Sequence, residues 1–225
     1  MSETAPSPPI GYPVTYDVDA QISDRNRLTC FFRLILAIPH LILVGGPGYS
    51  AFSFSFGFGQ AKGGWFGGGS AGVLGLVAGV MAIVSWFAIV FTGRHPRGLW
   101  DFAQLYMRWR TKAIAYTALL RDEYPPFGDG DYPVTYDVSY PEQARDRWSV
   151  GLRIIYVIPH VLILIFLGVA WAVTALIAWF AILFTGNYPQ GLYRFAVGVM
   201  RWSVRVESYL LLMRDEYPPF SMEPA

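Results

Sequence analysis

Long apolar segments separated by short polar stretches dominate the chain. The segment Ile154–Tyr193 contains no Asp, Glu, Lys or Arg. One helix over this segment would be about 60 Å long, twice the thickness of the hydrocarbon core of a bilayer. We therefore expect it to fold back near Gly168 into a hairpin of two membrane spans. Leu28–Val44 and Gly72–Phe91 are the matching segments nearer the N-terminus, so the sequence predicts four membrane segments.

The first segment of each predicted hairpin carries an arginine near its start and a proline in its body. These residues are Arg33 with Pro39, and Arg153 with Pro159. Such a segment can tilt, kink or enter the bilayer without crossing it, so a re-entrant hairpin is an alternative. Both versions return the chain to the side from which it entered.

An amphipathic helix is predicted after each hairpin. Gly93 and Gly186, each followed by a proline three residues later, are typical of a helix end. Apolar residues then recur at intervals of three and four. They are Leu99, Phe102, Tyr106, Trp109, Ala113, Tyr116 and Leu120, and later Leu192, Phe195, Val199, Trp202, Val206, Tyr209 and Met213. This spacing predicts a helix in each place, and the Pro-Pro that follows ends it.

Several strings occur twice and in the same order. RDEYPPF at Arg121–Phe127 returns at Arg214–Phe220, and YPVTYDV at Tyr12–Val18 returns at Tyr132–Val138. The alternation in YPVTYDV predicts a short strand, and the two copies can pair if the helices support them. The sequence is therefore interpreted as two copies of one unit.

The two repeats are assigned to residues 8–127 and 128–220. The first contains a Gly/Phe-rich insertion at about residues 45–71. Insertions are tolerated at exposed loop tips, so this one is taken to mark the turn of the hairpin. Its glycines favour a flexible linker over an aromatic loop that touches membrane or a partner.

Composition favours a membrane protein. Apolar residues make up 54% of the chain and charged residues 15%, against roughly 25% charged in soluble domains. The net charge of +1 argues against a nucleic-acid-binding protein. Lys62 is the one basic residue in a predicted hairpin tip, so both termini are predicted to be cytoplasmic and the protein multi-pass in the cytoplasmic membrane. The expected fold class is all-α and integral to the membrane, with two parallel repeats. Each repeat has a short strand, a transmembrane hairpin and a cytoplasmic amphipathic helix.

Ionisable residues inside membrane segments are candidate functional residues. Arg33 and His40 are seven residues apart on one helix face, as are Arg153 and His160. The simpler interpretation is that each histidine satisfies polar groups beside a proline kink and that the arginines reach the headgroups.

Aromatic and basic residues on the amphipathic helices are candidates for lipid contact. They are Arg108, Trp109, Arg110, Arg201, Trp202 and Arg205. Such residues suit a helix at headgroup level, and packing of each helix on its own hairpin or on its twin is an equal alternative.

No catalytic, cofactor-binding or metal-binding set is predicted. GxSxG, P-loop, HExxH and CxxC patterns are absent from the sequence, and two histidines without a carboxylate in the spans are too few for a metal site. A single cysteine, Cys30, excludes an intrachain disulfide.

The order YPVxxDVxYP, RxxxxIPH, WFAIxFTGxYPxGL, RW and RDEYPPF resembles a bacterial membrane family known as a domain of unknown function, DUF4389. The second copy carries these motifs more fully. The first has Ala20-Gln21 in place of the second Tyr-Pro and is interrupted by the insertion. The resemblance implies a membrane location and no particular activity.

The function expected from the sequence is that of a non-enzymatic structural or partner-binding component of the membrane. Its partners would be the lipid bilayer and a membrane protein or a second copy. The alternative is a transporter of a small solute or lipid that uses the interface between the repeats, with His40 and His160 lining the path.

Overall fold

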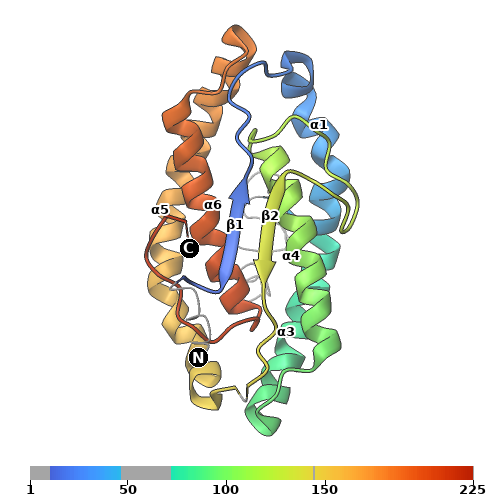
Figure 1. Cartoon of the computed structure of the whole chain (residues 1–225), viewed down its shortest axis with the longest axis vertical. Helices are drawn as coiled ribbons and strands as arrows, with labels where there is room; N and C mark the ends of the chain where they lie inside the picture. The colour runs from blue at the N-terminus through green and yellow to red at the C-terminus, as the bar shows by residue number, and fades with distance from the viewer. Residues whose placement is uncertain (1–10, 47–71, 144, 225) are drawn as a thin grey trace, which may run out of the picture.

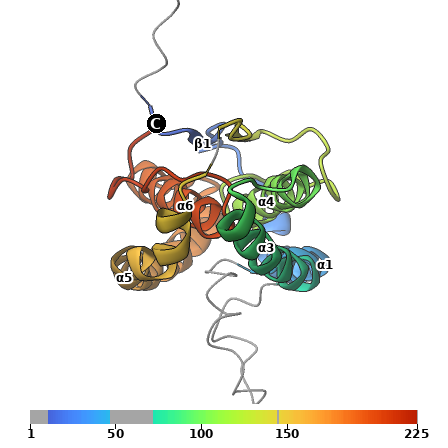
Figure 2. The same ribbon diagram turned by 90° about the horizontal axis from the view of Figure 1, so that it is seen from below.

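The chain forms three layers in the order strand ribbon, short helices and long helices. The computed structural model describes residues 11–46, 72–143 and 145–224. Seen end-on, the ribbon covers helices α4 and α6, and these cover α1, α3 and α5 (Figure 2). The two halves of the chain contribute the same kinds of elements in the same order.

The ribbon consists of β1 (Val14–Val18) and β2 (Val134–Val138), paired antiparallel. Tyr16 lies opposite Tyr136 at its centre. Alternate residues are buried, as the period-two pattern predicts. Each strand packs on the short helix of the other half, β1 on α6 and β2 on α4 (Figure 1). The predicted strands and their pairing are confirmed. Because each strand packs on the short helix of the other half, the packing of each half depends on the other.

The middle layer is formed by α4 (Arg97–Thr117) and α6 (Gln190–Leu210). Both helices are covered on two sides, by the ribbon and by the long helices (Figure 2). Most of their C-terminal halves are therefore buried, and the main apolar core lies between them and the ribbon. The predicted helices exist, but they lie inside the molecule.

The predicted hairpin of the second half is wrong. Residues Arg147–Thr185 form one helix, α5, of 39 residues that runs the length of the molecule (Figure 1). The helix continues through Pro159 and through Gly168, where a Cβ would meet nothing within 4 Å. It ends at Gly186 in a left-handed conformation, as predicted. The prediction assumed that each apolar helix is only as long as the bilayer is thick, and this assumption does not hold for α5.

The first half has two helices in place of α5. They are α1 (Arg27–Val44, 18 residues) and α3 (Gly72–Thr92, 21 residues), which follow one another along the same side of the molecule (Figure 1). In the sequence repeat Val44 corresponds to Leu164 and Gly72 to Ile165, two consecutive residues of α5. The insertion therefore interrupts one long helix and marks no turn. Residues 47–71 lie outside the described residues.

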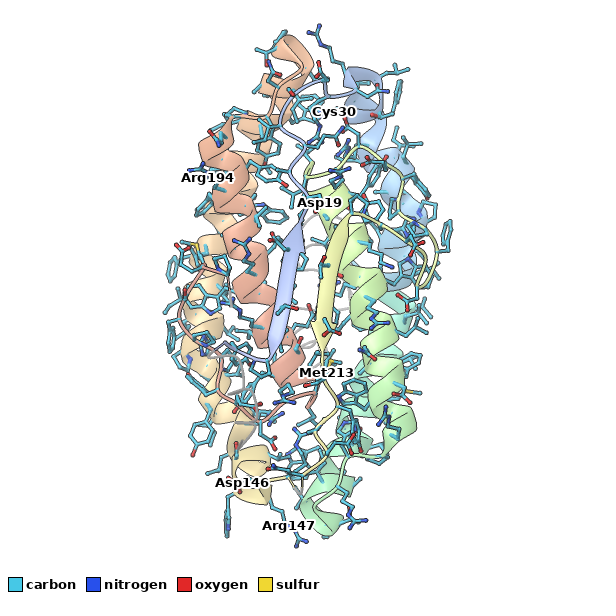
Figure 3. All side chains as sticks on the ribbon, viewed as in Figure 1. Asp19, Cys30, Asp146, Arg147, Arg194 and Met213 are labelled. Atoms are coloured by element: carbon cyan, nitrogen blue, oxygen red, sulfur yellow. The ribbon has the colours of Figure 1, made fainter. Side chains whose placement is uncertain are left out.

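Backbone and indole groups join the ends of the two halves. The Arg25 amide donates to the Gly186 carbonyl and the Arg145 amide to the Gly93 carbonyl, both at 2.9 Å. Near each end, a tryptophan indole of one long helix donates to the backbone of the other. These contacts are Trp86 to the Val150 carbonyl and Trp179 to the Cys30 carbonyl. The long helices are thereby held antiparallel, with their N-terminal ends at opposite ends of the molecule, near the labelled residues Cys30 and Arg147 (Figure 3).

Candidate functional site

The aspartate of each RDEYPPF string holds two buried arginines. Asp122 pairs with Arg25 at 2.7 Å and with Arg33 on α1. Arg33 also donates to the carbonyl of Tyr116 in the last turn of α4 and to that of Arg121, which follows α4. Because the last carbonyls of a helix have no partner within it, this arginine both satisfies them and joins α4 to α1.

The second half repeats this cluster. Asp215 pairs with Arg145 at 2.5 Å and with Arg153 on α5 at 2.6 Å. Arg153 donates to the Tyr209 carbonyl and Arg145 to the Leu212 carbonyl at the end of α6. We call the two sets the arginine–aspartate clusters.

Both aspartates are ionised at neutral pH. Burial acts to raise the pKa of Asp122, but hydrogen bonds from Arg25 and the Asn26 amide, with the charges of Arg25 and Arg33, hold that pKa below its usual range. The pKa of Asp215 is lowered against burial in the same way by Arg145 and Arg153. Two guanidinium groups surround each carboxylate, and these ion pairs connect the segment after the short helix (α4 or α6) to the long helix (α1 or α5).

Each candidate histidine lies in an aromatic enclosure. The Trp109 indole donates to His40 Nδ1 at 3.0 Å, and the Phe127 ring stacks on the imidazole at 4.5 Å. Tyr124 covers another side at 5.0 Å between ring centroids. His40 is 1% exposed. Because Nδ1 accepts a hydrogen bond, it carries no proton, and the imidazole is neutral.

His160 has the same enclosure in the second half. Trp202 donates to its Nδ1 at 3.0 Å, Phe220 stacks on it at 4.0 Å, and Tyr217 lies at 4.8 Å. The two histidines are each enclosed by aromatic residues of their own half. The structure therefore does not bring His40 and His160 together at the interface between the halves.

The repeated strings are thus the contacting parts of one module. The aspartate of RDEYPPF binds the arginine of RxxxxIPH, while its tyrosine and phenylalanine cover the histidine to which the RW tryptophan donates. Taken alone, the RDEYPPF string predicts only a helix end. The joint recurrence of the three strings in the same order was the signal that could have indicated contact.

One buried ion pair has no counterpart in the repeat. Arg110 pairs with Glu207 at 2.9 Å, and they are 1% and 5% exposed. Arg110 also donates to the Val44 carbonyl at 2.8 Å, the last residue of α1. In the repeat, Ser203 occupies the place of Arg110 and Ile114 that of Glu207. The ion pair therefore accompanies the break between α1 and α3, because it satisfies a carbonyl that a continuous helix would satisfy itself.

The family described as a domain of unknown function (DUF4389) matches the chain at residues 70–128 and 147–222, which together exceed half of its length. The chain belongs to this family. The first matched segment contains α3 and α4 and the second contains α5 and α6, and each extends through an RDEYPPF string, as expected for two tandem copies. Comparisons with curated proteins and with solved structures give no match.

The predicted lipid-contact residues of this DUF4389 chain lie mostly inside it. Arg110, Trp202 and Arg205 are buried, and Trp109 is partly buried against His40. Arg205 donates to the carbonyls of Ser221 and Glu223. The ribbon and the long helices cover the faces of α4 and α6 that carry these side chains, so the described structure does not present Arg110, Trp202 and Arg205 on its surface.

Arg108 and Arg201 face the ribbon side of the DUF4389 chain. Arg108 pairs with Asp129 at 2.9 Å, and Arg201 pairs with Asp17 of β1 at 2.7 Å. Both side chains are partly exposed. They form part of the polar surface around the ribbon.

The described part of the DUF4389 chain contains no group of three or more His, Cys, Asp or Glu placed to hold a metal ion. A hollow of about 560 Å³ near one end is lined by Tyr140, Arg145, Arg214 and Asp215 among others. Arg145 and Asp215 are paired with each other, and Arg214 pairs with Glu216. The hollow is polar and open, and its charges already have partners.

Proposed function

We propose that this protein is a non-enzymatic component of the cytoplasmic membrane, with one face in lipid and the opposite face available to a protein partner. The distribution of exposed apolar side chains carries the proposal. Nearly all large ones among the described residues lie on α1, α3 and α5, including Phe31, Phe87, Phe166 and Phe184. These three helices are long and apolar enough for a membrane environment.

The ribbon side supports the second half of the proposal. Thr15, Asp17, Thr135 and Asp137 point outward from the ribbon and are exposed. Arg108 and Arg201 lie beside them. Basic residues favour the cytoplasmic side, and the last described residues also lie on the ribbon side (Figure 2). The ribbon face is therefore proposed to be cytoplasmic.

Fractionation of cells that express the full chain tests the membrane part of the proposal. We expect the protein in the membrane pellet after washes with high salt and with alkaline carbonate, and in solution after detergent. Protein that is soluble without detergent would contradict the proposal.

Photo-crosslinking tests the partner part. A crosslinking amino acid at Thr135 should give a discrete crosslinked protein, while the same group at Leu162, which is 55% exposed on α5, should react with lipid. The Asp17→Asn/Asp137→Asn variant should reduce the Thr135 product if the ribbon charges contribute to binding. Equal protein crosslinking from both positions would contradict the assignment of the two faces.

The described residues do not support the transporter alternative. It requires polar residues along a path between the halves, whereas His40 and His160 are each enclosed by aromatic rings. Solute or lipid flux in vesicles that depends on the wild-type protein and is lost in the His40→Ala/His160→Ala variant would support transport.

A further inference from the structure

We infer that the protein lies in a single leaflet, with α1, α3 and α5 parallel to the membrane plane, so that none of the helices in the described part of the chain crosses the bilayer. The inference rests on the proposed membrane location and adds its geometry. Length and composition alone would allow each of these helices to span a membrane. Three observations on the whole molecule exclude that arrangement for the described structure.

The first observation is the extent of the apolar surface along the long helices. Exposed apolar residues on α5 run from Trp148, 82% exposed, to Phe184, 76% exposed. A helix of 39 residues is about 58 Å long, whereas the hydrocarbon core is about 30 Å thick. If α5 stood along the membrane normal, nearly half of its exposed apolar side chains would be in water.

The second observation is the position of the charged ribbon. The ribbon lies midway along the molecule and runs parallel to the long helices (Figure 1). The side chains of Asp17 and Asp137 on its outer face are 63% and 70% exposed. A bilayer perpendicular to the long helices would surround the middle of the molecule and place both carboxylates near its centre. Burial of ionised groups there is costly.

The third observation is that exposed basic residues lie at both ends of the molecule. The exposed Arg194 lies near one end of the molecule and the exposed Arg147 near the other (Figure 3). Arg27, the first residue of α1, and Arg97, the first residue of α4, are also exposed and lie at opposite ends (Figure 1). A spanning orientation would put one of these sets on the outer side of the membrane, against the usual bias of basic residues. With the long axis in the membrane plane, both ends lie at the same surface.

The remaining orientation places the outer layer of helices among the acyl chains of one leaflet. A helix layer is about 10 Å thick, less than the roughly 15 Å depth of one leaflet's hydrocarbon region. The layer of α4 and α6 would then lie at headgroup level and the ribbon in water (Figure 2). This arrangement hides the apolar side chains and leaves the ribbon charges solvated.

Depth measurements along α5 test the inference. Ile155, Leu162, Val169 and Leu176 are each more than half exposed and lie at intervals of seven residues, so they share a face over roughly 31 Å of helix. Each is replaced by cysteine in a Cys30→Ala background and labelled with a fluorophore. The full chain is then reconstituted into phosphatidylcholine/phosphatidylglycerol vesicles with lipids brominated at different acyl positions.

We expect the same depth within one leaflet for all four labels. A matched set on the interrupted helix, at Ile35, Ile42, Leu76 and Ile83, gives an independent series should an α5 variant fail to fold. Thr135→Cys on the ribbon is the control, and bromolipids should leave it unquenched.

The other outcomes separate the inference from the proposed function. Depths that pass through the bilayer centre from Ile155 to Leu176 would overturn the single-leaflet arrangement and leave the membrane location intact. Labels that no bromolipid quenches would overturn both. Labels shielded from water and lipid alike, in a chain that is dimeric without detergent, would also overturn both and would identify a second copy as the cover of the apolar face.

Discussion

The two halves of the chain build the layer of long helices from the same number of residues but in different ways. On one side α5 is continuous, while on the other α1 and α3 together supply the same number of residues and are interrupted. Only the interrupted side has Arg110 at the helix end and Glu207 against it. The comparison teaches that an insertion can break a helix when a buried side chain from a neighbouring element satisfies the broken end.

The largest expected effect comes from removing one partner of that ion pair. Arg110→Ser introduces the residue found at the repeat position and removes the guanidinium that pairs with the buried Glu207 carboxylate. We expect a loss of about 3 to 5 kcal/mol in the free energy of unfolding. Thermal and denaturant unfolding in detergent measure it.

The double variant Arg110→Ser/Glu207→Ile is the control, because both substitutions copy the repeat. Removal of both charges should restore much of the stability, although the Val44 carbonyl loses its donor. A single variant as stable as the wild type, or a double variant worse than the single, would contradict the role assigned to the pair.

The two arginine–aspartate clusters should differ in their sensitivity. Asp122→Asn and Asp215→Asn each leave two buried arginines without a carboxylate, but the Asp122 side chain is 10% exposed and the Asp215 side chain 26%. Asp122 also accepts a hydrogen bond from the Asn26 amide at the start of α1. We expect Asp122→Asn to cost about 3 kcal/mol or more and Asp215→Asn less. The reverse order in thermal unfolding would contradict this ranking.

Deletion of residues 45–71 should make the two sides alike. It joins Val44 to Gly72 in the register of Leu164 and Ile165, so the chain can form one helix. We expect helix content by circular dichroism to be retained. The Arg110→Ser/Glu207→Ile pair should then cost about 1 kcal/mol less than in the full chain, because the Val44 carbonyl gains a partner in the helix. Collapse of helix content on deletion would show that the interruption is required.

The last effect appears only in acid. Burial, and next the charge of Arg145, lower the pKa of His95 to about 4. The unfolded chain takes up a proton near pH 6.5 and the folded chain does not, so this contribution to stability is complete above pH 6.5 and is lost as the pH falls to 4. His95→Tyr, which copies Tyr188 of the second half, should flatten stability between pH 6.5 and 4. The loss of stability caused by protonation of Asp122 and Asp215 should still occur in this variant, at pH values below that range. An unchanged slope would contradict the assignment to His95.

Much of the secondary structure could be predicted from local patterns. The strands followed from the alternation in YPVTYDV, and the helix ends at Gly93 and Gly186 from glycine and proline. The resemblance to DUF4389 could also be seen, because its strings recur intact.

The arrangement of the long helices could not be predicted in the same way. An apolar run fixes helix formation but not the direction of the helix relative to a bilayer. The in-plane direction inferred above rests on the position of the ribbon at mid-length, which no local sequence pattern reveals. The role of Arg110 was hidden because its partner, Glu207, lies on another helix and its acceptor is a backbone carbonyl. The enclosures of His40 and His160 depend on residues from three segments, which periodicity within one segment does not reveal.

Oriented circular dichroism of the reconstituted full chain in aligned bilayers tests the central claim most directly. All described helices run roughly along the same axis of the molecule (Figure 1). If that axis lies in the membrane plane, the spectrum with light along the bilayer normal should be that of in-plane helices. A spectrum of helices aligned with the normal would contradict the claim.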